Sequence, residues 1–287
     1  VLSEPNWGSS LLLGINGCAT RHPSCCSQRN TAKVAWLGSS RRTAGGLRDH
    51  CEFCYSRDII FFGAGAMNFE FSEEQHLLRD QARAFLAEYC PTDTVRAVLD
   101  SDNEWDQSLW QRVAEMGWTA TVIPEAYGGL GLSHYELAIL AEEMGRSVAP
   151  LPFSSSVYLA SEAILTFGSE GQKSEWLPKL ASGECVGTVA MWERPGALAL
   201  EQLATRRLGD TISGVKSPVP DAGVADVAVV LAHSDAGLEA CLVPMDQAGV
   251  QQQSVMTLDG SRGHSTLTLD NAEAEILGHN TIEPSAW

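Results

Sequence analysis

The sequence predicts an α+β protein, in which an all-α helical domain (residues 67–183) precedes a second domain of short strands (residues 184–278). In the first region, apolar residues recur every three or four positions, and residues that cap helices precede these runs. In the second region, Gly, Pro, Asn and Asp separate short apolar runs at intervals of roughly ten residues, as expected for a small β-sandwich or barrel. The change of period near residue 184 therefore predicts a domain boundary.

Two helices are expected at the start of the helical region. Ser72 stands three residues before Gln75, which is the spacing of a capping box, and the helix that it opens should end before Pro91. Asp106 is expected to cap the second helix, which Gly117 should end. The residues predicted to face inward are Leu78, Ala82, Phe85, Leu86, Tyr89, Leu109, Trp110, Val113 and Met116.

Three more helices are expected before the strands begin. Ser133 and Glu136 form a second capping-box pattern, and this helix should end at Gly145. A fourth helix is predicted over residues 152–168 and a fifth over residues 169–183. The aromatic residues on these faces are expected to pack in the core or at an interface and not against a cofactor; they include Trp110, Trp118 and Trp176.

Five short apolar runs in the second region predict strands. They cover residues 186–192, 211–215, 227–232, 240–243 and 265–269. No run of 18 or more apolar residues occurs, so no membrane span is predicted. The net charge of −17 disfavours nucleic acid and anionic membranes as partners.

The first 66 residues differ from the rest of the 287-residue chain in charge, cysteine content and periodicity. They hold seven basic and four acidic side chains and five of the eight cysteines, and they lack a sustained apolar period. Four interpretations stay open: an upstream extension without a fold of its own that ends where Met67 begins the protein, a cleaved organellar transit peptide, a zinc site, or a small domain of unknown type. The residues that suggest the zinc site are Cys51 and Cys54, with Cys25, Cys26, His22 and His50.

Three stretches of the chain resemble the acyl-CoA dehydrogenase family. Residues 123–133 read IPEAYGGLGLS, residues 142–146 read EEMGR, and residues 170–184 carry the family's Gln-Lys and Trp-Leu-Pro elements. The segment Ile212-Ser213-Gly214-Val215-Lys216 is similar to an element of the family's middle domain. The resemblance implies a β-barrel for the second domain, FAD as the cofactor, and oxidation of an acyl-CoA thioester to the 2-enoyl-CoA, as in fatty acid β-oxidation. It also implies an electron-transfer flavoprotein as acceptor and assembly into homo- or hetero-oligomers.

The chain departs from the family where the flavin is expected to bind. Trp192 stands where the family has a threonine, and no Gly-Ser pair follows it. After Lys216, the family's Trp-Ile-Thr/Ser element is replaced by Ser217-Pro218-Val219-Pro220. These departures resemble divergent bacterial members, in particular partner subunits of heteromeric acyl-CoA dehydrogenases. Backbone N–H donors do not depend on side chains. Two interpretations therefore stay open, flavin contact or plain β-core packing, for Met191, Trp192, Val219 and Pro220.

No catalytic residue is assigned within the chain. The family resemblance implies that the glutamate base lies in a C-terminal four-helix domain, which is absent from this sequence, and residues 279–287 are expected to be a truncated tail. The chain alone is therefore expected to be inactive. The alternative function is that of a non-catalytic structural partner in a heteromeric acyl-CoA dehydrogenase. The expected compartment is the bacterial cytoplasm, or the mitochondrial matrix if the first segment is a transit peptide.

Other chemistries find little support in the sequence. The seven histidines do not show metal-ligand spacing, so no metal site is assigned beyond residue 66, and no Gly-x-Ser-x-Gly element indicates a hydrolase. The acidic pair Glu142-Glu143 is expected on a solvated helix face or at a subunit or domain contact. Arg206 and Arg207 are expected to form a surface pair.

Overall fold

The computed structural model describes residues 70–278, except residues 102, 104, 197 and 199. All of the described residues belong to the unit that spans residues 66–287. The transit-peptide, zinc-site and extension hypotheses concern residues outside this described part.

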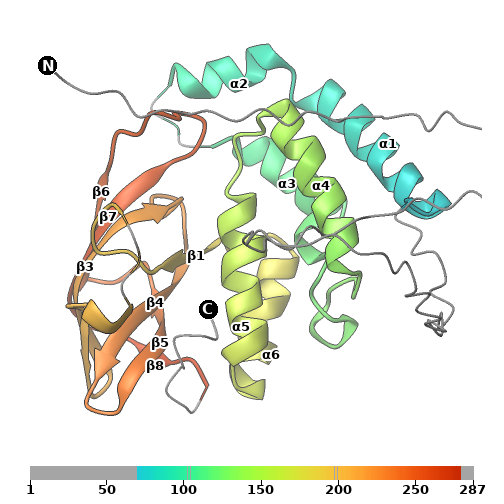
Figure 1. The fold of residues 1–287 in the computed structure, drawn as a ribbon. Coiled ribbons are helices and arrows are strands. Elements are labelled where there is room, and N and C mark those ends of the chain that lie inside the picture. The colour runs from blue at the N-terminus through green and yellow to red at the C-terminus, as the bar shows by residue number, and fades with distance from the viewer. Residues whose placement is uncertain (1–69, 102, 104, 197, 199, 279–287) are drawn as a thin grey trace, which may run out of the picture. The chain divides into compact units, whose positions relative to one another are not determined.

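Three of the predicted helices begin at the expected capping residues (Figure 1 shows the helices). The Ser72 side chain accepts from the Gln75 amide in a complete capping box, Ser133 and Glu136 form another, and Asp106 accepts from the Leu109 amide at 3.0 Å. The helical elements are α1 (Glu73–Tyr89), α2 (Thr92–Leu99), α3 (Gln107–Glu115), η1 (Trp118–Ala120), η2 (Glu125–Tyr127), α4 (His134–Ser147), η3 (Ser154–Ser161, a π-helix), α5 (Glu162–Phe167) and α6 (Glu170–Ala181).

One helix and one helix boundary differ from the prediction. Helix α2 was not expected, because Pro91 was interpreted only as the end of α1. Pro91 also stands at the N-cap of α2, where its missing N–H costs no hydrogen bond. Helix α4 continues past Gly145 to Ser147 and ends at Val148, which adopts a left-handed conformation. The fourth predicted helix is present as the continuous pair η3 and α5.

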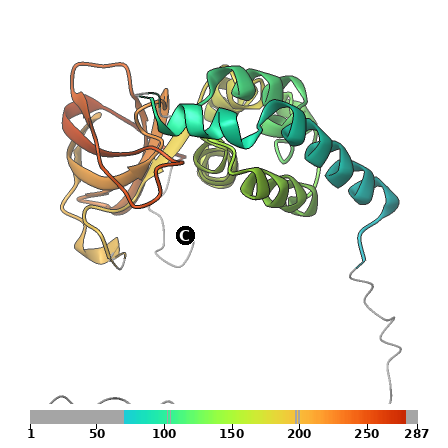
Figure 2. The ribbon, with the colours of Figure 1, turned by 90° about the horizontal axis from the view of Figure 1, so that it is seen from above.

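The strands form one curled, mixed sheet, an open half-barrel beside the helices (Figures 1 and 2). Its order is β6-β7-β3-β2-β4-β5-β8, and β1 pairs with β4 in parallel. The helical region followed by a barrel-like β region confirms the predicted fold class. The strands are β1 (Gly187–Ala190), β2 (Arg206–Leu208), β3 (Thr211–Pro220), β4 (Val227–Ser234), β5 (Gly237–Pro244), β6 (Val250–Ser254), β7 (His264–Glu273) and β8 (Glu275–Ile276).

Strand β4 is buried on both faces. Val227, Val229 and Leu231 pack in one cluster with residues of α5 and α6. Ala228 and Val230 point into a second cluster inside the curl of the sheet. Successive side chains of a strand point to opposite faces, so a strand covered on both sides reads as a continuous apolar run. A third cluster fills the space between α1, α3, α4 and η3.

The glycine-rich loop after residue 123 folds back on the segment before it. The Gly131 amide donates to the Ile123 carbonyl at 2.9 Å, and the Tyr127 hydroxyl donates to Glu170 at 2.8 Å. A Cβ atom on Gly129 would lie 1.9 Å from the Ile123 carbonyl oxygen, so this close approach requires glycine. The loop is thus an architectural element that holds η1 and η2 against α6.

Two sets of charges expected at the surface are instead buried or half-buried. The Glu143 side chain is 1% exposed and accepts from Arg83 and Arg146, because α1 packs along α4. Arg207 is half-buried and donates to Glu239, whose side chain is 5% exposed. The solvated positions predicted for Glu143 and Arg207 are therefore wrong, whereas Arg206 is exposed.

Candidate functional site

The four residues predicted to contact a flavin lie on two segments that run side by side, β1 with the residues that follow it and the second half of β3. Met191 and Trp192 follow the last residue of β1, and Val219 and Pro220 close β3. The Ser217 amide donates to the Trp192 carbonyl at 2.7 Å. The structure therefore brings the two segments together from positions about thirty residues apart in sequence. We call this region the β1–β3 edge.

The four residues are not equally accessible. Val219 is fully buried in the cluster inside the curl of the sheet and pairs with Ser265 of β7. Met191, Trp192 and Pro220 are half-buried. A ligand at this edge could therefore touch the side chains of three of these residues, whereas Val219 could offer only its backbone.

Hydroxyl groups around the β1–β3 edge already bond to the protein. Thr188 donates to the Pro220 carbonyl at 2.5 Å, and the Ser217 and Thr266 hydroxyls lie 2.9 Å apart. In contrast, the backbone N–H groups of Met191 to Glu193 have no hydrogen-bond acceptor within the described part of the chain. Unpaired amide donors at a strand end are suited to the carbonyl oxygens and ring nitrogens of a planar heterocycle.

A buried ion pair holds the end of β1 in place. The Lys216 side chain is fully buried, and its Nζ lies 3.1 Å from Glu193 Oε1 and 3.3 Å from the Met191 carbonyl oxygen. Glu193 also accepts from the amides of Ala204 and Thr205 and from the Thr205 hydroxyl, at 2.6 to 2.8 Å. Trp192 is thus fixed between two anchored residues.

The two charges shift each other's protonation. Burial lowers the pKa of Lys216 to about 8, although the Glu193 charge opposes this shift. Burial alone would raise the pKa of Glu193, but the hydrogen bonds from Thr205 and Ala204 and the Lys216 charge lower it to about 2. Glu193 is therefore ionised at neutral pH. The sequence alone gave neither residue a role, because their contact joins segments that are 23 residues apart.

A cavity of about 290 Å³ opens beside Trp192. Its lining includes Arg194, Leu198 and Gln202, together with Glu193. An indole ring, a guanidinium group and apolar side chains together can contact a flat, polar ring system. This cavity and the unpaired amides make the β1–β3 edge the candidate site.

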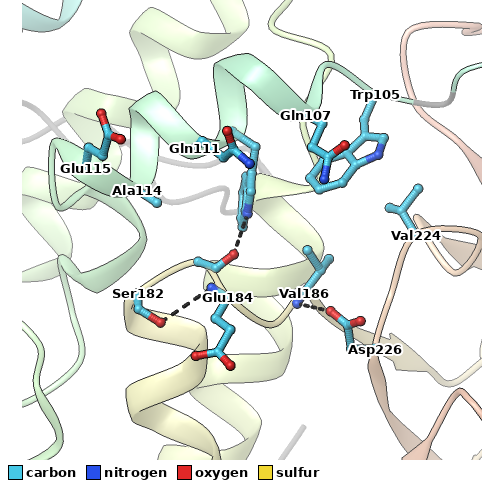
Figure 3. A pocket seen from close by; sticks show the side chains of 12 residues that line it. Trp105, Gln107, Gln111, Ala114, Glu115, Ser182, Glu184, Val186, Val224 and Asp226 are labelled. Carbon is cyan, nitrogen blue, oxygen red and sulfur yellow. Dashed lines mark hydrogen bonds between the residues drawn. The ribbon is translucent and has the colours of Figure 1, made fainter.

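A second, larger cavity of about 710 Å³ lies elsewhere. Figure 3 shows its lining, with Trp105 and Gln107 on one side and Val224 and Asp226 on the other. Several polar groups in its wall already bond to one another. The Val186 amide donates to the Asp226 carboxylate at 2.7 Å (Figure 3), and Trp110 donates to the Gly183 carbonyl at 2.9 Å. Its wall includes Val186, which precedes β1, but none of the four residues predicted to contact a flavin.

Cysteine, metal and membrane chemistry receive no support from the described residues. Burial raises the pKa of Cys90 to about 11 and those of Cys185 and Cys241 to about 12, so these thiols are unreactive. No group of three or more His, Cys, Asp or Glu side chains suited to a metal ion occurs in this part of the chain. None of the helices described here has the length and apolar character needed to cross a membrane.

Comparisons with known proteins identify relatives of the chain. Residues 72–184 match the family model described as "Acyl-CoA dehydrogenase, N-terminal domain". The mitochondrial short-chain specific acyl-CoA dehydrogenase of Sus scrofa is 30% identical over 225 residues, which cover 74% of this chain and 54% of the relative. The chain thus spans about half the length of this relative.

Two solved structures share the fold. The ChsE4–ChsE5 complex from Mycobacterium tuberculosis superposes with a TM-score of 0.67 and 25% identity, over 74% of this chain and 58% of that chain. An acyl-CoA dehydrogenase from Bacillus anthracis, complexed with FAD, superposes with a TM-score of 0.65 and 26% identity, over 73% and 38% of the two chains. The sequence match and the shared order of helices and strands lead to one conclusion: the chain belongs to the acyl-CoA dehydrogenase family.

Proposed function

We propose that this chain is part of a flavoprotein that oxidises an acyl-CoA thioester to the 2-enoyl-CoA with FAD. The observation that carries the proposal is the set of unpaired N–H groups from Met191 to Glu193, beside the half-exposed Trp192. Family membership supplies the reaction class, and the relative from Bacillus anthracis is known with FAD.

The β1–β3 edge fits a flavin through its backbone more than through its side-chain hydroxyls. The three amides would donate to the ring, the Trp192 indole would cover or border it, and Pro220 would contact its edge. FAD, when bound, would accept the hydride that leaves the acyl group. The Lys216–Glu193 pair would keep Met191 and Trp192 in one position, so that the donors are oriented before the ligand arrives.

Glu193 is unsuited to remove the α-proton of the substrate. Its carboxylate is held by three hydrogen bonds and by Lys216, and a carboxylate with a pKa of about 2 is a weak base. We therefore place the catalytic base outside the described residues. The electron acceptor in this proposal is an electron-transfer flavoprotein, and the compartment is the bacterial cytoplasm.

A second candidate function is that of a non-catalytic partner in a heteromeric acyl-CoA dehydrogenase. Two observations favour it: Trp192 occupies a position where the family resemblance implies a hydroxyl, and the Val219 side chain is buried. The ChsE4–ChsE5 complex is a relative made of two different chains.

One purification separates the two candidates. The polypeptide encoded by the complete gene is expressed alone and together with a homologous subunit, and its visible absorption is recorded before and after anaerobic addition of an acyl-CoA. Flavin that copurifies with the single polypeptide and bleaches with acyl-CoA supports the enzyme. Colourless protein that gains flavin and activity only with the homologue supports the partner function.

A further inference from the structure

A groove of about 440 Å³ lies between the end of α4, η3 and the loop that joins β6 to β7. This volume falls within the range of about 300–1,000 Å³ of small-molecule sites. Most of its wall is apolar. The apolar side chains belong to Ala141, Met144, Val148, Ala149, Leu151 and Phe153. Such a wall suits a hydrocarbon group.

The polar side of the groove carries one more negative than positive charge, and its charged groups are already bonded. Arg262 donates through Nε and Nη2 to both oxygens of Asp221 and through Nη1 to Ser154. Asp259 accepts from the Ser261 amide and hydroxyl. One guanidinium thus faces two carboxylates, and a ligand carboxylate would meet no uncompensated positive charge.

Tyr158 is the exception among these polar groups. Its ring stacks edge-on against Phe153, with the centroids 5.5 Å apart, but its hydroxyl has no hydrogen-bond partner among the described residues. Burial raises the pKa of this hydroxyl to about 12, so it stays protonated at neutral pH. A protonated hydroxyl beside a neutral ion pair offers a donor to an uncharged oxygen.

The groove is linked to the Pro220 end of the β1–β3 edge through Arg262 of its wall, which donates to Asp221. Asp221, which holds Arg262, directly follows Pro220 at the end of β3, and its carboxylate also accepts from the Ser155 hydroxyl. The π-helix η3, which carries Tyr158, packs on β1. A thioester bound near Pro220 would therefore have the groove next to it.

We infer that this groove receives the end of the acyl group remote from the thioester and selects acyl groups that carry a neutral oxygen there, a hydroxyl or a ketone. The Tyr158 hydroxyl donates to that oxygen, and the apolar wall covers the hydrocarbon before it. Plain acyl groups leave the hydroxyl unpaired, and ω-carboxylates face Asp221 and Asp259. The inference rests on the proposed function, since it concerns the substrate of the same site.

The test measures binding of three CoA esters of one chain length by calorimetry, with the protein encoded by the complete gene. They are octanoyl-CoA, ω-hydroxyoctanoyl-CoA and ω-carboxyheptanoyl-CoA. Tyr158→Phe removes the hydroxyl and keeps the ring packing, and Tyr135→Phe, at an exposed tyrosine of α4, is the matched control. We expect Tyr158→Phe to weaken binding of the ω-hydroxy ester about tenfold and that of octanoyl-CoA less than about twofold, as the loss of one hydrogen bond predicts. The ω-carboxy ester should bind most weakly, and Tyr135→Phe should change nothing.

The outcomes separate this inference from the proposed function. If octanoyl-CoA binds and bleaches the flavin while all three esters respond equally to Tyr158→Phe, the inference is overturned and the proposed function stands. Tightest binding of the ω-carboxy ester would also overturn it. If no CoA ester binds and no flavin is present, the proposed function is refuted, and the inference is refuted with it.

Discussion

The ammonium group of Lys216, with no exposed surface, lies 3.1 Å from the carboxylate of Glu193, and this pair joins the end of β1 to β3. Breaking a buried pair from one side leaves an unpaired charge, which typically costs about 3 kcal/mol or more. We expect Glu193→Gln to lower the free energy of unfolding by about 3 kcal/mol in urea denaturation. Glu201→Gln, at an exposed position, should change it by less than about 0.5 kcal/mol. Equal effects of the two changes would show that the pair contributes no stability.

The same pair predicts a pH dependence at the alkaline side. The pKa of Lys216 falls from 10.5 to about 8 on folding, so the unfolded chain binds more protons than the folded protein between these values. The free energy of unfolding should therefore rise with pH across this window because of Lys216. In Lys216→Met this contribution is expected to vanish, and the difference between the two urea-denaturation profiles from pH 7.5 to pH 10.5 measures it. Parallel profiles would contradict the assignment.

Glu143 should contribute far more to the free energy of unfolding than its neighbour Glu142. Its side chain is 1% exposed and bridges Arg83 and Arg146, whereas that of Glu142 is 58% exposed. Glu143→Gln is expected to lower the free energy of unfolding by about 3 kcal/mol, against less than about 0.5 kcal/mol for Glu142→Gln. The hydrogen bond from Arg83 lowers the pKa of Glu143, so its contribution is present above pH 4.5 and is lost as the pH falls below that value. A wild-type advantage that persists unchanged at lower pH would refute this.

Gly129 and Gly145 provide a matched pair of alanine substitutions. A Cβ on Gly129 would clash with the Ile123 backbone, while a Cβ on Gly145 meets nothing within 4 Å. We expect Gly129→Ala to cost about 3 kcal/mol or more, as overpacking against rigid backbone does. Gly145→Ala should stabilise α4 by up to about 1 kcal/mol, since alanine is the better helix former. The midpoint of thermal unfolding gives the sign of each effect, and a destabilised Gly145→Ala protein would contradict the open space at this position.

Substitutions at Trp192 and Val219 should distinguish a residue that binds flavin from one that packs in the core. Trp192→Ala is expected to lower the ratio of bound flavin to protein with little loss of stability, because the indole is half-exposed. Val219→Ala should keep the flavin ratio and lower the free energy of unfolding by about 2 kcal/mol, because this side chain is fully buried. Absorption spectra and urea denaturation of both variants supply the two readouts. Flavin loss in Val219→Ala at full stability would reverse these assignments.

The sequence predicts most elements whose signal is local. The capping residues Ser72, Asp106 and Ser133 each open a helix where the spacing of polar and apolar residues predicts one. The apolar run of β4 is equally clear. These signals depend on neighbours within a few residues, so no knowledge of the fold is needed to interpret them.

Elements with weak local signals were missed or shortened. Strand β6 has the sequence VQQQS and is mostly exposed, so it lacks the alternation that identifies a strand. Strand β3 was expected to end at Val215, where the apolar run ends. It continues to Pro220, and its register with β7 shifts between Lys216 and Val219, which accommodates the prolines.

In the candidate site, too, some features follow from the sequence and others depend on the fold. The neighbourhood of Met191, Trp192 and Pro220 follows from the family pattern, but the burial of Val219 depends on which face of β3 turns inward. The contacts of Glu143 with Arg83 and of Tyr158 with the groove join segments that are far apart in sequence. Only the folded arrangement of α1, α4, η3 and the β6–β7 loop reveals them.

The double-sided burial of β4 has a consequence for cooperativity. One row of its side chains completes the core beneath α5 and α6, and the other row completes the core inside the sheet. If either core unfolds, β4 loses its packing on that side, and the other core then loses the support of the same strand. The helices and the sheet should consequently melt in a single step, with equal calorimetric and van't Hoff enthalpies, although the chain reads as two regions of different secondary structure.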